Sequence, residues 1–427
     1  MDKNQFNESL IDFLKAAPTP FHAVQCMARA LKSVGFEELH EEEQWRTPPG
    51  KYFVTRNQSS IIAFIIGSSD MADTGIRMVG AHTDSPCLKV KPHPDRHKHG
   101  YHQLGVEVYG GVLLNPWFDR DLSLAGRVTY RSSDGRLRNS LINLERPIAI
   151  IPSLAIHLDR EANNNRKVNP ETDMAPLLLQ AQDSYSIQDL IGPEVDDEQI
   201  LASDLSFYDT NPPSLIGERR EFIASARLDN LLSCFTGMTS LMNAEVKFTS
   251  LLVCNDHEEV GSASAAGAEG TFLRDVLERI TEPGESRKRT FARSLLVSTD
   301  NAHGIHPNYS DKHESNHGPI LNRGPVIKFN ANQRYATNSE TAGYFKALCQ
   351  SIDVPVQEFV NRADMSCGST IGPITAKEIG VKTIDVGVPT FAMHSIRELA
   401  GADDAHNLMQ VLSTFFGDDG PLGATPS

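Results

Sequence analysis

The sequence lacks an apolar run long enough to cross a membrane, and it lacks an excess of basic residues. Its longest apolar stretches, such as IIAFIIG at 61–67, fall far short of the roughly 20 residues that a spanning helix needs. With 40 basic against 55 acidic residues, the net charge is −15. Nucleic acids and anionic membranes require a basic surface, so we expect no nucleic acid and no membrane as a partner.

Cysteine is also scarce. Six cysteines are scattered over 427 residues, and no CxxC pair occurs among them. The first twenty residues do not combine a basic start with an unbroken apolar stretch, as a signal peptide would. Together these features predict reduced thiols in a cytoplasmic protein. The remaining composition, 40% hydrophobic and 22% charged, is that of a soluble chain able to bury a core.

Both ends of the chain combine helical and strand-like sequence patterns. Residues 1–91 begin with amphipathic helical patterns over 4–17 and 21–36, and strand-like runs follow. A helical pattern returns over 221–242, and strands and helices alternate from there to the end. Such alternation is typical of a largely parallel sheet with helices on both faces. We therefore predict one α/β domain formed by 1–91 and 226–427, with a mixed, largely parallel sheet flanked by helices.

The middle of the chain differs. Residues 92–225 consist of short strand patterns with turn signals, including a hairpin turn at Asp134–Gly135. We interpret this stretch as a β-rich insertion. The histidine-rich segment at its start, 91–102, is predicted to be a charged connector with exposed histidines. The last residues, 417–427, are expected to form a loose tail.

Acidic and imidazole side chains follow four of the predicted strands. In open α/β sheets, ligands bind beyond the carboxyl ends of the strands. Any one of these side chains alone would be a solvated loop residue or a helix cap. Together, and with almost no lysine or arginine among them, they would repel one another strongly. The residues are His82, Asp84, Glu258, Glu259, Asp300 and His394, with Asp229 at the start of a predicted helix.

Two divalent cations would remove this repulsion. Nitrogen and oxygen donors without thiolate suit Zn²⁺, Co²⁺ or Mn²⁺ at a catalytic site. Two such ions, roughly 3.5–4 Å apart, share a bridging carboxylate, so five ligands provide two for each ion and one bridge. Of the adjacent Glu258 and Glu259, we expect one to bind metal. The other would remain available as a general base and then a general acid.

Five motifs carry a resemblance to a known family. AHTDSP, SARLDNL, CNDHEEVGS, STDNAHGIHPNY and FAMHSIRE occur in this order, and together they resemble the motif set of the M18 metallo-aminopeptidases, the aspartyl aminopeptidase family. AIHLDR and KFNANQRYATN match the family as well, so the likeness covers nearly the whole chain. It implies a zinc-peptidase-like catalytic domain, 1–91 plus 226–427, with 92–225 inserted for oligomerisation.

The resemblance also implies how the two metal ions, most simply Zn²⁺, are held. One ion is bound by His82 and Asp300, the other is bound by Glu259 and His394, and Asp229 bridges them.

Further residues gain roles from the same resemblance. Glu258 is implied to be the general base, and Asp84 to orient the imidazole of the ligand two residues before it. His157, in the insertion, is implied to reach a neighbouring subunit's site and help stabilise the oxyanion. Lys328 is implied to face an acidic substrate side chain, with Arg334 close to it in sequence.

The family's subunits assemble into tetrahedral dodecamers, so a homo-oligomer is expected. The expected substrates are peptides from which the N-terminal residue is removed, commonly Asp or Glu and in some members a neutral residue. Three alternatives stay open: a cysteine hydrolase using Cys367, a carboxypeptidase or deacylase of the same fold, and a non-catalytic metal-binding assembly scaffold. The sequence assigns no role to His303, His306, His313 or His317.

Overall fold

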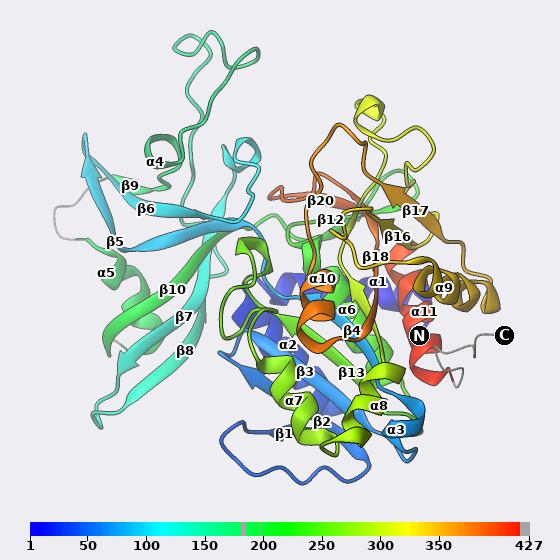
Figure 1. Cartoon of the computed structure of the whole chain (residues 1–427). Helices are drawn as coiled ribbons and strands as arrows, with labels where there is room; N and C mark the ends of the chain where they lie inside the picture. Colours follow the sequence, from blue (N-terminus) through cyan, green and yellow to red (C-terminus); the bar gives the residue numbers. More distant parts are fainter. Residues whose placement is uncertain (181–184, 197, 419–427) are drawn as a thin grey trace. The chain divides into compact units, whose positions relative to one another are not determined.

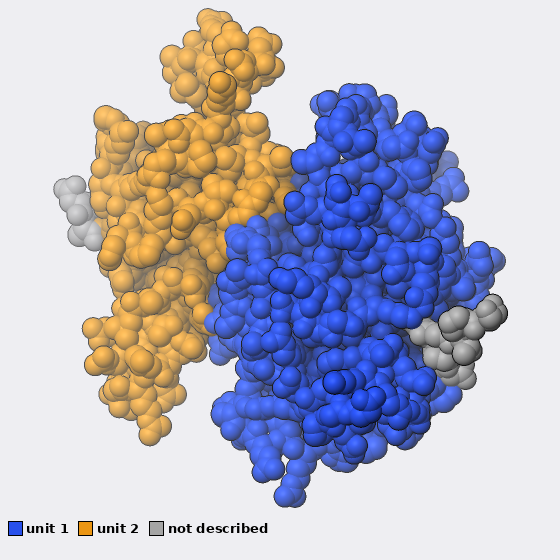
Figure 2. All heavy atoms as spheres, viewed as in Figure 1, with its two compact units in different colours: residues 1–84, 213–393, 398–427 blue, residues 85–212, 394–397 orange. Residues whose placement is uncertain are grey.

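The computed structural model describes residues 1–180, 185–196 and 198–418, so most of the predicted tail lies outside the described residues. The chain forms two compact units, coloured separately in Figure 2. The first comprises Met1–Asp84, Pro213–Met393 and Glu398–Ser427, and the second Ser85–Pro212 with His394–Arg397. These units divide the chain near 84 and 212, whereas the sequence places its boundaries at 91 and 225. No described helix combines the length and apolar character that a membrane span requires.

The first unit contains a sheet of nine described strands in the order β1-β2-β3-β13-β4-β14-β18-β16-β17 (Figure 1). Five of its neighbouring pairs are parallel and three are antiparallel. The prediction of a mixed, largely parallel sheet is therefore confirmed. The strands are β1 (Glu37–Leu39), β2 (Gly50–Arg56), β3 (Ser60–Ile66), β4 (Arg77–His82), β13 (Ser250–Asn255), β14 (Leu295–Thr299), β16 (Val326–Phe329), β17 (Gln357–Val360) and β18 (Lys382–Gly387).

Helices cover both faces of this sheet, because its central strands are apolar on both sides. In β3, for example, Ile61 and Ile65 join one core cluster and Ile62 and Phe64 join another. One cluster is formed with α1 (Lys3–Ala16), α2 (Pro20–Ser33), α6 (Leu228–Met242), α9 (Ser339–Ser351) and α11 (Asp404–Gly417). The other includes residues of α7 (Phe272–Ile280), with α3 (Met71–Thr74), α8 (Glu285–Arg293) and α10 (Ile371–Ile379) packed against it.

A smaller sheet in the first unit corrects one sequence interpretation. Residues 221–242 do not form one helix, because β12 (Phe222–Ser225) pairs with β20 (Glu398–Gly401) before α6 begins. The left-handed backbone of Arg227, with φ of 62°, separates the strand from the helix. The other strands of this sheet are β11 (Ser214–Ile216), β15 (Ala302–His303) and β19 (Pro389–Phe391).

The second unit is built on a six-stranded sheet in the order β8-β7-β10-β5-β6-β9. The hairpin predicted around Asp134–Gly135 is confirmed, since β7 and β8 pair antiparallel on either side of it. The elements are β5 (Cys87–Lys98), β6 (Tyr101–Tyr109), β7 (Leu122–Arg131), β8 (Leu137–Asn143), β9 (Leu177–Gln180), β10 (Gln199–Asp209), α4 (Pro170–Asp173) and α5 (Ile187–Ile191).

The histidine-rich segment is not a connector. It forms the hairpin of β5 and β6, whose turn lies at His99 and Gly100, both with positive φ. His102 is fully buried; its ring stacks on His97 at 4.5 Å, and its Nε2 lies 2.8 Å from Asp95 Oδ1. His93, His97 and His99 are exposed as predicted, so the prediction of exposed histidines is wrong only for His102. Alternate residues of a strand face opposite sides, so a charged segment can still bury a side chain on one face.

Candidate metal centre

Three neighbouring strands of the nine-stranded sheet carry the candidate site at their carboxyl ends. β4 runs parallel to both β13 and β14, so all three chains leave the sheet at the same edge. β4 ends at His82 itself, and Asp300 is the first residue after β14. After β13 the chain turns into a short 3-10 helix, Glu258–Val260, which bears the paired glutamates.

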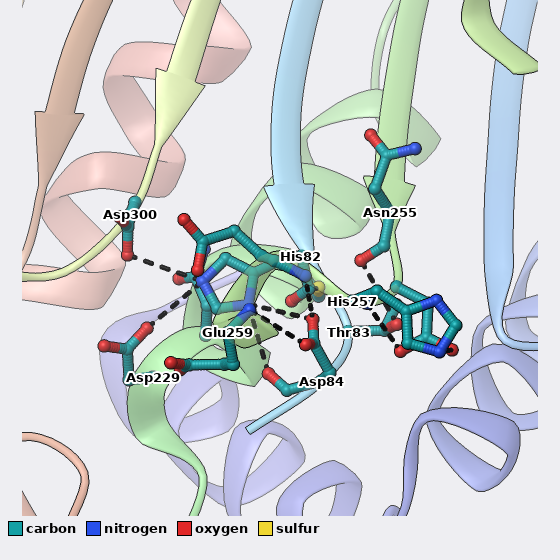
Figure 3. A network of polar contacts seen from close by, with 12 residues as sticks. His82, Thr83, Asp84, Asp229, Asn255, His257, Glu259 and Asp300 are labelled. Atoms are coloured by element: carbon teal, nitrogen blue, oxygen red, sulfur yellow. Dashed lines mark hydrogen bonds and ion pairs between the residues drawn. The ribbon is translucent and has the colours of Figure 1, made fainter. Parts of the chain in front are cut away.

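Three predicted ligands of the first unit, Asp229, Glu259 and Asp300, lie around the imidazole of a fourth, His82 (Figure 3). Its Nε2 lies 3.4 Å from Asp229 Oδ1 and 3.6 Å from Asp300 Oδ1. One ligand atom from each of His82, Asp229 and Glu259 lies within 4.8 Å of the other two. These four side chains, which come from separate sequence motifs, thus form a compact cluster of nitrogen and oxygen donors.

Asp84 contacts both His82 and the turn that carries Glu258 and Glu259. Its carboxylate accepts the backbone N–H groups of Glu258 and Glu259, each at 3.1 Å. The Oδ1 atom that accepts from Glu258 also lies 3.4 Å from Nδ1 of His82, and the Asp84 carbonyl lies 3.1 Å from the same nitrogen. Asp84 therefore holds both the imidazole and the turn that presents the glutamates.

The backbone around Asp229 is also fixed from outside the cluster. Asp229 has non-helical dihedral angles, and its N–H donates to Oε2 of the buried Glu398 at 2.9 Å. The Sγ of Cys234 donates to the His82 carbonyl at 3.0 Å. Sequence reasoning missed both supports. Glu398 ends the motif FAMHSIRE, so the motif carried the signal, whereas nothing in the sequence distinguishes Cys234.

Electrostatics shows how much the cluster depends on positive charge. Burial, together with Asp300, Asp229 and Asp84, raises the pKa of Glu258 to about 8, although His82 opposes this rise. Burial and Asp229 likewise raise the pKa of Glu259 well above its usual value. These acids are therefore poorly suited to carry their charges together unless a cation joins them.

His82 and Asp300 respond in the opposite sense. Burial lowers the pKa of His82, but Asp229, Asp300 and Asp84 outweigh it and raise the pKa well above the usual value. Burial would raise the pKa of Asp300, but Lys328 and His82 lower it below the usual range. The acids around His82 thus favour positive charge at this position.

The donor set fits divalent cations of the zinc type. Imidazole nitrogen with carboxylate oxygens is the combination found at catalytic Zn²⁺, Co²⁺ and Mn²⁺ sites. Ligating histidines usually have their second ring nitrogen bonded to a carbonyl or carboxylate, and His82 has this arrangement through Asp84.

His394 and His157 belong to the second unit. His394 Nδ1 lies 3.0 Å from the Gly111 carbonyl, a contact that favours the tautomer with its lone pair on Nε2. His157 is exposed in a loop without regular structure. The roles of His394 as a ligand and His157 as an oxyanion stabiliser stay predictions.

Lys328 and Arg334 have very different environments. Lys328 is buried on β16, and its ammonium donates to main-chain carbonyls beside the metal centre. Arg334 is exposed in the loop that follows. Cys367, the alternative nucleophile, packs against an apolar cluster that includes Tyr335 and Phe359, which is the environment of a structural thiol.

Three of the four histidines without an assigned role lie around a cavity of about 300 Å³ in the first unit. His303, His306 and His313 line it together with apolar side chains such as Phe359 and Phe391. His317 instead contacts the carboxylate of Glu314.

Comparison with known proteins supports a metallopeptidase. The family described as "Aminopeptidase I zinc metalloprotease (M18)" matches residues 13–416. A "Probable M18 family aminopeptidase 2" of Stutzerimonas stutzeri is 56% identical over 97% of this chain and 98% of its own length.

Solved structures are similar along the same length. A chain in the structure of the Ape4 and Nbr1 complex superposes with a TM-score of 0.94 at 40% identity, covering 97% of this chain and 86% of that one. The S. cerevisiae mApe1 dodecamer gives a TM-score of 0.85 at 27% identity over 97% of both chains.

Proposed function

The chain belongs to the M18 family of zinc metallo-aminopeptidases, and we propose that its centre works with two divalent cations per chain. One observation carries this proposal: His82, Asp229, Glu259 and Asp300 meet at one sheet edge. We assign His82 and Asp300 to one ion, Glu259 and His394 to the other. A bridging Asp229 would then give each ion three protein ligands.

Bound there, the two cations would polarise the scissile carbonyl and activate water for attack. Glu258 takes the proton from that water and returns it to the leaving amine. Its backbone is held by Asp84, so the carboxylate is presented from a fixed turn. Burial and the neighbouring acids raise the pKa of Glu258 to about 8, and adjacent cations would lower it again, so that the ionised carboxylate could accept the proton of the water.

The substrate is proposed to be a peptide with a free N-terminus, from which the first residue is removed. The preferred residue is Asp or Glu, with neutral residues as the second candidate class. We further propose a homo-oligomer, in the form of a tetrahedral dodecamer. The similar S. cerevisiae mApe1 is itself a dodecamer, and the second unit would serve as the assembly domain with His157 reaching a neighbouring site.

The cellular location proposed is the cytoplasm. All six cysteines are free thiols, which supports a reducing compartment.

The decisive experiment combines metal analysis with a substrate panel. Purified protein is loaded with Zn²⁺, Co²⁺ or Mn²⁺, and its metal content is measured alongside hydrolysis of Asp-, Glu- and Leu-peptides. We expect two ions per chain, cleavage only of peptides with a free N-terminus, and complete loss of activity with chelator. Zinc-loaded protein that binds one ion would contradict the two-cation proposal.

Adding N-blocked peptides and a thiol alkylator to this panel separates the alternatives. A carboxypeptidase or deacylase would cleave N-blocked substrates, which an aminopeptidase must reject. A cysteine hydrolase would survive chelation and lose activity with a thiol alkylator. A non-catalytic scaffold would bind metal and cleave none of the peptides.

A further inference from the structure

Glu398 is a buried acid that the proposed mechanism does not use. Only 2% of its surface is exposed, and its Oε2 accepts the backbone N–H of Asp229 at 2.9 Å. It begins β20, whose antiparallel register with β12 pairs it with Ser225. Because the chain reaches Asp229 four residues after Ser225, this strand pairing brings Glu398 to the segment that carries the proposed bridging ligand.

The N–H of Asp229 needs an acceptor from outside its own helix. The first N–H groups of a helix have no partner within the helix, and a capping side chain usually supplies one. Arg227, the residue before α6, has a left-handed backbone and makes no capping hydrogen bond through its side chain. Asp229 is buried, and buried N–H groups are nearly always paired in native proteins. Glu398 provides the acceptor from a distant part of the chain.

The carboxylate of Asp229 faces the metal centre from this fixed backbone. Its Oδ1 lies 3.4 Å from Nε2 of His82. The next residue is held as well, because Nδ2 of Asn230 donates at 2.8 Å to the carbonyl of Thr299, the last residue of β14. With the backbone held at two consecutive residues, the Asp229 carboxylate can move only through its own side-chain torsions. Glu398 is the partner that acts on Asp229 directly.

We propose that Glu398 is a positioning residue: by accepting the Asp229 N–H, it holds the Asp229 carboxylate where that group can bridge two divalent cations. This inference rests on the proposed two-cation function. The loss of an outer partner of a metal ligand typically weakens metal binding by roughly 10- to 100-fold. Because a bridging carboxylate serves both ions, loss of the Glu398 acceptor should weaken the binding of both.

Other roles of Glu398 lead to different results. If Glu398 only stabilised the pairing of β12 and β20, its loss would lower the unfolding free energy and leave the zinc affinity of the folded protein unchanged. If its negative charge were what mattered, removing the charge would be as harmful as removing the acceptor. If it acted through His394, four residues earlier in the chain, the binding of only one ion would change.

The test compares Glu398→Met with Glu398→Gln in the full-length chain. Methionine has a similar length and lacks the oxygen acceptor, whereas glutamine keeps an acceptor and lacks the charge. Both zinc dissociation constants are measured by competition with a chromogenic chelator, on protein whose fold is checked by circular dichroism. In Glu398→Met we expect both constants to rise by about 10- to 100-fold. In Glu398→Gln they should stay within about threefold of the wild type, because the hydrogen bond is retained.

Two further variants complete the comparison. Glu8→Met, at an exposed position of α1, is the matched control and should change neither constant. In an Asp229→Ala background, Glu398→Met should leave the residual zinc binding as it is, because the group that Glu398 holds is already absent. If Glu398→Met does not fold, Glu398→Asp, which shortens the side chain and keeps its charge, is judged by the same constants.

Four results would overturn the proposal. They are unchanged zinc affinity in Glu398→Met, a change in one constant alone, equal losses in the methionine and glutamine variants, and a further loss in the Asp229→Ala background. Failure of the proposed function gives a different pattern. Wild-type protein that binds zinc but cleaves no peptide would remove the peptidase assignment, and the zinc constants would still decide the role of Glu398. Wild-type protein that binds no zinc would overturn both.

Discussion

The pKa values of Glu258 in the first unit and of Asp134 in the second unit shift in opposite directions. In the metal centre, burial and neighbouring acids raise the pKa of Glu258 to about 8. In the β-rich second unit, hydrogen bonds from Ser132, the Arg136 backbone and Arg138 lower the pKa of Asp134 to about 2. One carboxylate is buried among like charges, and the other is exposed with its donors in place.

The difference indicates which carboxylates need a positive partner that the chain itself does not supply. Glu171, also in the second unit, is contacted by Lys91 and Arg96, which lower its pKa. Such acids are stable as ions within their own surroundings. Glu258 and Glu259 gain stability as ions when a cation enters, whereas Asp300 already has Lys328 and His82 beside it. The two buried glutamates are therefore explained by a ligand rather than by the fold.

The largest effect is expected at Asp229. Asp229→Ala removes the proposed bridge, so the remaining acids lose the ions that hold them together. Metal analysis should show reduced zinc content, and peptide hydrolysis should fall to the level of metal-free protein. Asp12→Ala, at an exposed position of α1, is the control and should keep both. Full zinc occupancy in the Asp229 variant would remove this residue from the ligand set.

The next largest effect separates catalysis from metal binding. Glu258→Gln preserves shape and removes the base, so kcat should fall by about 10²- to 10⁴-fold. Zinc content should remain that of the wild type, because Glu258 is not proposed as a ligand. Glu282→Gln, at an exposed position after α7, is a suitable control. Near-normal turnover in the Glu258 variant would show that another group moves the proton.

Most of the cluster could be predicted because its residues, apart from Asp229, lie at or shortly after the ends of apolar strands. The parallel strands β4, β13 and β14 end at one edge, so His82, the Glu258–Glu259 pair and Asp300 had to meet there. Runs of apolar residues followed by acids reveal this without any coordinates.

Other features depend on contacts between distant segments, and the local sequence does not encode them. The strand character of Phe222–Ser225 comes from pairing with β20, about 175 residues later. The burial of His102 on β6 depends on the neighbouring strand β5, whose Asp95 contacts its ring nitrogen. The environment of Lys328 is set by the turn after β14, whose carbonyls accept from its ammonium.

A smaller effect is expected on the pH dependence of stability, through a buried histidine outside the candidate metal centre. His22, in α2, is 7% exposed, and burial, Arg227 and Arg29 lower its pKa from 6.5 to about 4. The unfolded chain binds a proton at this position more tightly than the folded chain. Stability is therefore complete above about pH 6.5 and declines as the pH falls toward 4, by at most about 3 kcal/mol.

Denaturant titrations at pH 4 to 7 measure this decline. His22→Asn retains a partner for Thr19 Oγ1, which lies 2.8 Å from His22 Nδ1 in the wild type, but it cannot titrate. The difference in unfolding free energy between the variant and the wild type should move in the variant's favour as the pH falls. Parallel pH profiles would mean that His22 keeps an ordinary pKa.

The smallest effect is expected at a surface pair of the second unit. Arg127 and Asp204 face each other across β7 and β10 at 2.9 Å, with 51% of the Asp204 side chain exposed. Asp204→Asn should lower the unfolding free energy by less than about 1 kcal/mol, because solvent screens the pair. In 1 M salt, where the screening length is about 3 Å, that difference should disappear. A salt-independent loss of several kcal/mol would mean that this pair behaves as a buried one, and the contrast between the two units would then not hold.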